Sequence, residues 1–564
     1  MIPIRPAGPC QAPTDAIPVT ESVLEDAARF LTLAWVAFRR LCASRLCQIL
    51  VAAGLVNLAA GLVFGLGESN PTTSVVVDRI YANFAMAAWA LAVAASGEIP
   101  GRHGWHLAAK ATAVVATTLI AFLLAGLVGA GYQWLRGHGI EWDVYAHGLL
   151  FNLGWNAAHL AVLAVVVHAV IDRRWLATTV TAAAYATANL AFDTELVRFA
   201  APIDPFSDIG GYGVRFAPHL ALGIYWTGLC AALLVGVHLV YAPSGRRLTP
   251  TSVAWGWGGL VVGIASGCWV AFRPVAAAAL PPSLPEVPRP VYSRIDLQVE
   301  LDPAEGWLRS RGSAVVVNKH DAAIPDIHFD VPPGLAVKSL SLTGERLAAT
   351  VETSVVSFRL NRPLEPRETL KVAFDFQSRA GASADRVVAN GTVLRIFDVL
   401  PALGGMDRET FFARAPPTTF GVRLATSLDQ IAVAPGALER EWKENGARFF
   451  EYRTNVPIRP VATFHSGRFA VAHRDMDGTP VEIYYHPSHG SAVAAMAALA
   501  RTRLGGIGGD LPGPVRVVEV PDWRHAVRPP GILGFNWRRA ANKGDWPSDA
   551  SVLSYSELAV PVEG

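Results

Sequence analysis

A charge-free stretch of twenty residues, Val253–Phe272, divides this chain into two parts of different composition. Arg246 and Arg247 precede it, and Arg273 follows it directly. Twenty apolar residues in an α-helix rise about 30 Å, which is the thickness of the hydrocarbon core of a bilayer. The residues before this stretch are mostly hydrophobic, and those after it have the pattern of a water-soluble β protein. The two parts therefore need separate interpretations.

The composition favours a membrane protein. Of the 564 residues, 52% are hydrophobic and only 17% are charged, whereas soluble domains contain about 25% charged residues. The net charge of +2 is too small to indicate a nucleic-acid partner. The five cysteines all precede residue 275 and have neither zinc-ribbon nor redox spacing.

Apolar runs and the placement of Lys and Arg predict seven membrane spans with a defined orientation. The runs cover residues 47–67, 80–97, 108–132, 144–171, 175–192, 218–242 and 253–272. One set of alternate loops carries most of the unbalanced positive charge, and the positive-inside rule places that set in the cytoplasm. Its members are Arg39, Arg40, Arg45, Arg102, Lys110, Arg173, Arg174, Arg246 and Arg247. We therefore expect a multi-pass protein of the cell (inner) membrane of a bacterium, with a cytoplasmic N-terminus and residues 275–564 outside the cytoplasm.

Polar residues inside the predicted spans are the first functional candidates. Asn152, Asn156 and His159 are spaced to share one helix face, where they could line a polar pathway. The alternative is that they form hydrogen bonds between tightly packed helices. No phosphate-binding loop of the G-x-x-x-x-G-K-[ST] type occurs. Transport would therefore require a separate ATPase as partner.

The soluble half begins after a Pro- and Ala-rich linker and is predicted to be a β sandwich or saddle. Alternating apolar residues and turn signals predict short antiparallel strands. A hairpin turn is expected at Asn390-Gly391, and a loop is expected over residues 400–417. The predicted strands cover residues 292–302, 307–319, 325–330, 335–342, 351–360, 369–377, 386–397, 418–426, 447–455, 462–473 and 479–485.

The pattern changes after Tyr485. A helix over 491–505 is followed by strands over 515–521 and 552–560, which indicates the start of an α/β domain. At the boundary, His486 and His489 are predicted to form a surface turn and not a metal site.

Three stretches resemble one protein family. They are RIDLQVELDPAEGWLRSRGSAVVVNK at 294–319, residues 426–458, and FHSGRFAVAHRDMDGTPVEIYYHP at 464–487. They are similar to the N-terminal β domain of aminopeptidase-N-like (gluzincin) zinc metallopeptidases. The resemblance is greatest to a membrane-bound bacterial branch in which such a peptidase follows an ABC transporter permease-like region. PFSDIGGYG at 205–213 resembles part of that region.

The resemblance implies five segments in a multi-domain chain. They are a cytoplasmic segment (1–46), a helical permease-like transmembrane bundle (47–274), a linker (275–290), an aminopeptidase-N-like β domain (291–487) and the incomplete start of a catalytic-type domain (488–564).

The sequence departs from the family where the chemistry would lie. The family binds Zn²⁺ through H-E-x-x-H on a helix, and this sequence contains no His-Glu pair. We therefore expect no catalytic or metal-binding residues and no activity from the chain alone, with zinc required only if a missing catalytic segment is supplied. LSYSELAV at 553–560 resembles a family strand that would make Glu557 a substrate-binding residue. The short loop at 97–106 puts coupling to an ATPase in doubt.

These observations leave three hypotheses. The first is a non-catalytic subunit or half-protein of a permease/metallopeptidase system, working with a second permease or peptidase subunit. The second is a fragment of an active membrane-anchored zinc aminopeptidase. The third is a pseudoenzyme, either a peptide-binding module or a transporter subunit that works with a separate ATPase.

Overall fold

The structure is a computed structural model. It describes residues 19–66, 71–99, 105–190, 196, 209–211, 216–241, 250–272, 288–332, 334–342, 349–352, 355–378, 386–404, 408–476, 478–504, 514–521 and 552–556.

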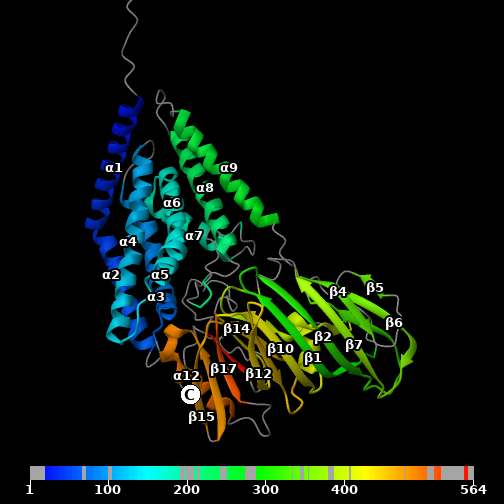
Figure 1. Ribbon diagram of the computed structural model, residues 1–564. Helices are drawn as coiled ribbons and strands as arrows, with labels where there is room; N and C mark the ends of the chain where they lie inside the picture. The colour runs from blue at the N-terminus through cyan, green and yellow to red at the C-terminus, as the bar shows by residue number, and fades with distance from the viewer. Residues whose placement is uncertain are drawn as a thin grey trace, which may run out of the picture.

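The N-terminal part is helical, and the part after residue 288 is rich in β structure, as the sequence predicts. Figure 1 shows the helices as an elongated bundle standing over one end of the β-rich region. The helices are α1 (Val19–Ala43), α2 (Arg45–Leu66), α3 (Thr73–Glu98), α4 (Trp105–Leu135), α5 (Trp142–Ala146), the π-helix η1 (His147–Gly154), α6 (Trp155–Val170), α7 (Arg174–Leu190), α8 (Phe216–Tyr241) and α9 (Pro250–Phe272).

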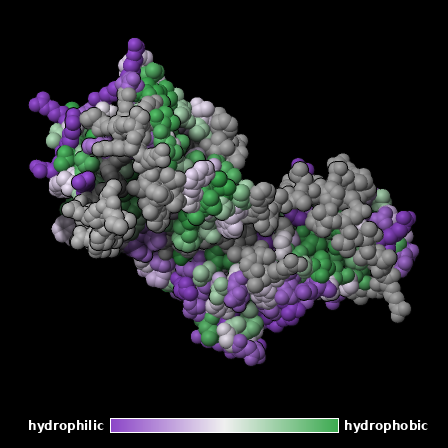
Figure 2. Space-filling model, turned by 90° about the horizontal axis from the view of Figure 1, so that it is seen from above, coloured by the Kyte–Doolittle hydropathy of each residue, from purple (hydrophilic) through white to green (hydrophobic). Residues whose placement is uncertain are grey.

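Five described helical segments are long and apolar enough to cross a membrane, namely Arg45–Phe64, Thr73–Glu98, His106–Leu135, Trp142–Val170 and Phe216–Val240. Their outer surfaces expose large apolar side chains, such as Val56 at 70% and Phe64 at 86%, which a lipid environment would cover. Figure 2 shows exposed apolar residues on the bundle, with hydrophilic ones at its outer edge, and hydrophilic residues along the β-rich region together with an apolar patch. The fifth and seventh predicted spans correspond to α7, which has 17 residues, and to α9. The count of seven spans stays a prediction.

Small residues allow close packing between the helices. A Cβ on Gly228 of α8 would lie 2.3 Å from the carbonyl oxygen of Gly259 and 2.9 Å from the Cα of Gly263, both on α9. The two backbones are therefore in direct contact, as is common where helices associate in lipid. This contact fixes α9, the helix that leads to the β-rich region, against α8.

The described strands of the β-rich region form four sheets. Their strand orders are β12-β13-β10-β1-β2-β7-β4, β5-β6-β3-β9, β11-β14-β8 and β15-β16-β17-β18. The strands are β1 (Val291–Asp302), β2 (Trp307–Val317), β3 (Ile324–Asp330), β4 (Leu335–Leu342), β5 (Ala349–Glu352), β6 (Val355–Leu364), β7 (Thr369–Ser378), β8 (Thr392–Arg395), β9 (Ala402–Leu403), β10 (Thr419–Ser427), β11 (Ile431–Val433), β12 (Ala437–Glu444), β13 (Ala447–Arg453), β14 (Thr463–Gly467), β15 (Ala470–Met476), β16 (Thr479–Tyr485), β17 (Val515–Val520) and β18 (Val552–Ser556).

One apolar core joins the first three sheets. It includes Ile295 and Val372 from the seven-stranded sheet, Phe329 from β3, and Leu394 and Phe464 from β8 and β14. Alternate residues of β1 are buried, as the period of two in its sequence predicts. The arrangement is therefore a layered β structure that buries one face of each sheet.

Several strand predictions are wrong in detail. Residues 437–444 form β12, which the sequence did not reveal, because this edge strand is exposed along most of its length and lacks apolar alternation. Over 386–397 only β8 is a strand, and α10 (Ile396–Val399) follows it. The expected loop at 400–417 contains β9 and α11 (Arg408–Arg414). The strand predicted over 462–473 is divided between β14 and β15.

The last sheet contains α/β-type connections, as predicted. β16, β17 and β18 run parallel, and α12 (Val493–Leu504) follows the 3₁₀ helix η3 (Pro487–Ala492) and packs on β16 and β17.

Arg516 of β17 fixes this last sheet to the seven-stranded one. Its guanidinium is 1% exposed; Nε donates to Glu482 at 2.7 Å, and an Nη donates to the carbonyl oxygen of Gly436 at 2.6 Å, just before β12. Burial raises the pKa of Tyr484, so its hydroxyl stays protonated and donates to the same Glu482 carboxylate at 2.9 Å. A buried charge with several partners holds the two sheets in one arrangement.

Replacing Arg516 by Met is expected to destabilise this junction by about 3–5 kcal/mol, because the Glu482 carboxylate and the buried carbonyl of Gly436 both lose the guanidinium as hydrogen-bond donor. Hydrogen exchange in β16 and β17 of the full chain should become at least about 100-fold faster. Arg501→Met, which removes an exposed arginine of α12, serves as the matched control and should change exchange little. Equal effects of the two substitutions would contradict the assignment.

Candidate functional site

The three polar residues predicted in the bundle lie together on α5–η1–α6. Asn152 belongs to η1, and Asn156 and His159 belong to α6. They are 3%, 2% and 3% exposed, so all three side chains are inside the protein. The π-helix, which the sequence analysis did not predict, changes the helical repeat just before α6; π segments often occur at functional positions.

The π-helix contributes a backbone acceptor to the neighbouring helix α8. His219 of α8 is 1% exposed, and its Nε2 lies 3.3 Å from the carbonyl oxygen of Phe151 in η1. A carbonyl oxygen only accepts, so Nε2 of His219 is the donor. This pair could not be predicted from the sequence, because its two residues are 68 positions apart.

Thr227 of α8 joins the aromatic and polar residues of α6. Its hydroxyl donates to the carbonyl oxygen of Gly223 at 2.7 Å. The indole Nε1 of Trp155 donates to Thr227 Oγ1 at 3.1 Å, and Nε2 of His159 lies 3.0 Å from the same oxygen. Since the single hydroxyl proton is directed to Gly223, His159 must also donate, which fixes its proton on Nε2.

This assignment makes Nδ1 of His159 a buried acceptor. In the part of the chain that the structure describes, no group donates a hydrogen bond to that atom. A buried acceptor without a donor is unfavourable by about 1–3 kcal/mol. The polar face of α6 is therefore partly satisfied by α8 and retains one acceptor for a proton donor.

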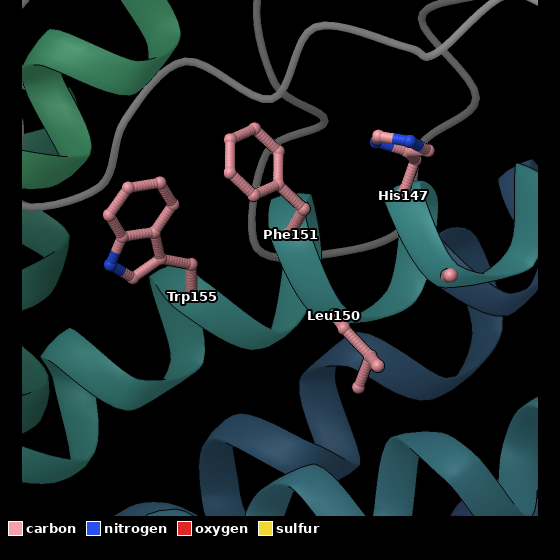
Figure 3. Close-up of a pocket in the computed structure, with 5 residues that line it drawn as sticks. His147, Leu150, Phe151 and Trp155 are labelled. Carbon is pink, nitrogen blue, oxygen red and sulfur yellow. The ribbon is translucent and has the colours of Figure 1, made fainter. Parts of the chain in front are cut away.

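A pocket of ≈ 370 Å³ opens beside this helix and is lined by Ala146, His147, Leu150, Phe151 and Trp155. Figure 3 shows His147, Phe151 and Trp155 projecting from one side of the helix, with Leu150 pointing elsewhere. The lining is almost entirely apolar and aromatic, so the pocket suits a hydrocarbon group and not an ion.

A second cluster lies where the parallel strands of the last sheet end. Nδ1 of His489 is 2.6 Å from Oε1 of Glu519, and the backbone N–H of His486 donates to Oε2 of Glu519 at 2.6 Å. A carboxylate only accepts, so Nδ1 of His489 carries the proton. The expected surface turn is wrong for His489, which is 1% exposed in contact with an equally buried glutamate.

This cluster does not fit a zinc ion. Both oxygens of Glu519 already accept hydrogen bonds, one from the backbone N–H of His486 and one from Nδ1 of His489. The carboxylate is therefore engaged with hydrogen-bond donors. Among the described residues, no group of three or more His, Cys, Asp or Glu side chains could hold a metal. Glu557, the predicted substrate-binding residue, lies outside the described residues. The strand before it ends at Ser556, which pairs with Val520.

No protein-family profile and no curated protein matches the chain. Among solved structures it resembles the M1 zinc metallopeptidase from Deinococcus radiodurans and a mutant of that enzyme bound to a Tyr-Ser-Ala substrate. For both, the identity is 17% and the TM-score is 0.31, with 41% of this chain covered. The matched region spans 57% of the mutant and 56% of the unmutated enzyme. A similarity of this size is too weak to support an activity.

Replacing Thr227 by Val is expected to lower the stability of the bundle by about 1 kcal/mol, because Trp155 and His159 both lose their acceptor. Thermal unfolding of the full chain in detergent measures the effect. Thr112→Val is the control, since the Thr112 hydroxyl bonds only within its own helix, to the carbonyl oxygen of Ala108. If Thr227→Val lowers the unfolding temperature no more than Thr112→Val does, the assignment of Thr227 as the link between α6 and α8 is contradicted.

Proposed function

We propose that this chain is an integral membrane protein whose permease-like bundle carries an aminopeptidase-like β region outside the cytoplasm. In this proposal it is a non-catalytic subunit or half-protein of a permease/metallopeptidase system. The lipid bilayer surrounds the helices, and peptide chemistry, where it occurs, belongs to another polypeptide.

The observation that carries the proposal is the way the family-like stretches come together. Residues 294–319 form β1 and β2, and residues 426–458 include β13. Although they are more than 100 positions apart, β1 pairs in parallel with β10, and β10 pairs with β13. The two stretches therefore build one continuous sheet, as expected if both belong to one β domain of the resembled kind.

The arrangement of the helices supports the proposed orientation. Arg174, at the start of α7, forms an ion pair with Glu98, at the end of α3. These residues border two loops that the positive-inside rule assigns to the same side. Figure 1 shows the start of α1 at the end of the bundle away from the β-rich region, which agrees with a cytoplasmic N-terminus and an external β region.

The sequence supports a non-catalytic role for this chain. Zinc peptidases of the resembled family use paired histidines and a glutamate to activate water, and no His-Glu pair occurs here. The described His489–Glu519 pair is buried and internally hydrogen-bonded, which suits a structural role at the end of the sheet.

We expect the purified full chain to release no N-terminal amino acid from aminoacyl-nitroanilides, with or without added Zn²⁺, because it has no H-E-x-x-H motif to activate water. Metal analysis after dialysis should find less than one zinc per chain. Glu557→Gln should behave like the unaltered chain in both assays. Zinc-dependent turnover that a chelator abolishes would instead favour an active peptidase.

The topology can be tested with reporters fused after Pro288 in a bacterial host. Alkaline phosphatase, which is active only outside the cytoplasm, should be active there, and green fluorescent protein should be dark when exported in unfolded form. The same reporters after Arg174 should give the opposite result, because that loop is predicted to be cytoplasmic. A fluorescent fusion after Pro288 would mean that the number of spans is even.

A further inference from the structure

The segment between α7 and α8 reaches the β-rich region through Ile209. Besides Leu196, its described residues are 209–211, which precede α8, and Ile209 is only 5% exposed. The side-chain amide of Asn390 donates to the carbonyl oxygen of Ile209 at 2.8 Å. This bond joins positions 181 residues apart, one in the helical part and one just before β8.

Asn390 is held in place from the other side by the strand connection between β14 and β15. Its Oδ1 accepts the backbone N–H of Arg468 at 2.7 Å, and Asn390 is itself 8% exposed. The Arg468 side chain is fixed in turn, because Nε donates to Asp429 at 2.5 Å and an Nη donates to the carbonyl oxygen of Ala389 at 3.3 Å. The side-chain amide of Asn390 therefore donates a hydrogen bond to Ile209 and accepts one from Arg468 within the β-rich region.

The position after Asn390 requires a residue without a side chain. Gly391 has φ +75°, and a Cβ there would lie 2.6 Å from Cγ of Pro521 and 2.9 Å from Cγ2 of Ile209. The Ile209 side chain, Gly391 and Pro521 thus meet at van der Waals distance. The predicted hairpin turn at Asn390-Gly391 is wrong. These two residues do not join two paired strands; they contact Ile209.

We propose that residues 209–211 are an intramolecular docking element and that Asn390, Gly391, Arg468 and Pro521 form its receptor. The occupant of this surface is residues 209–211 of the same chain, and the contact consists of one buried hydrogen bond and one buried aliphatic side chain. The proposed function requires only a covalent tether, so this second attachment goes beyond it. It fixes the β-rich region in one orientation on the bundle.

The docking element lies between α8 of the bundle and the end of β17. Pro521 directly follows β17, two residues after the Glu519 that binds His486 and His489. On the bundle side, α8 begins five positions after Gly211 and packs on α9. The proposed contact therefore joins the segment before α8 to the end of β17, where ligands commonly bind in parallel sheets.

Cleavage of the tether tests this inference in the full chain. A specific protease site is inserted within residues 275–287, the protein is expressed in membranes, and the linker is cut. The docked β-rich region should remain with the washed membranes after cleavage. Asn390→Asp places a carboxylate oxygen against the Ile209 carbonyl but still accepts the Arg468 N–H, so it should increase the released fraction about tenfold or more.

Two further variants separate docking from folding. Asn361→Asp makes the same chemical change on an exposed residue of β6 and should release no more than the unaltered chain. Ile209→Asp leaves the sequence of the β-rich region unchanged, and it should also release that region without changing its protease resistance. Complete release of the unaltered protein after cleavage would overturn the proposal, as would full retention of both Asn390→Asp and Ile209→Asp.

Discussion

Hydrocarbon cannot hydrogen-bond the peptide backbone, and this constraint organises the whole molecule. A charge-free run such as Val253–Phe272 can enter a bilayer only as a helix, because a helix pairs its own amides and carbonyls. Strands depend on neighbours for their pairing, so the open sheets after residue 288 belong in water. The helix α9 connects the apolar helical part to the β-rich region, and the backbone contact between Gly228 and Gly259 fixes it against α8.

Single buried polar side chains hold the larger parts together. Arg516 joins the last sheet to the seven-stranded one, and Asn390 joins the β-rich region to Ile209, in the segment between α7 and α8. Apolar contacts alone would allow parts to slide, because hydrophobic burial is not directional. A buried amide or guanidinium is favourable only when its partners are in place, so it selects one arrangement.

The polar face of the bundle joins two helices and retains features that this contact does not use. The bonds from Trp155 and His159 to Thr227 join α6 to α8, which matches the interhelical role that the sequence left open. The buried Nδ1 of His159 and the aromatic pocket beside Phe151 are additional features that helix packing does not require. A polar pathway along Asn152, Asn156 and His159 stays a hypothesis, because their burial fits either role.

The sequence by itself determined the division into an apolar helical part and a β-rich part, together with most strand positions. These depend on local periodicity, as in β1, where alternate residues are buried. It did not reveal β12, whose residues are mostly exposed and which is held by pairing with β13 and by the stacking of Trp442 on Phe449. Burial of Asn152, Asn156 and His159 could be predicted from their place in an apolar run, but their partners could not. Only the tertiary structure decided that His489 is buried against Glu519 and that Ile209 meets Asn390. Each of these contacts joins residues 30 or more positions apart, and local periodicity contains no information about which distant segments will meet.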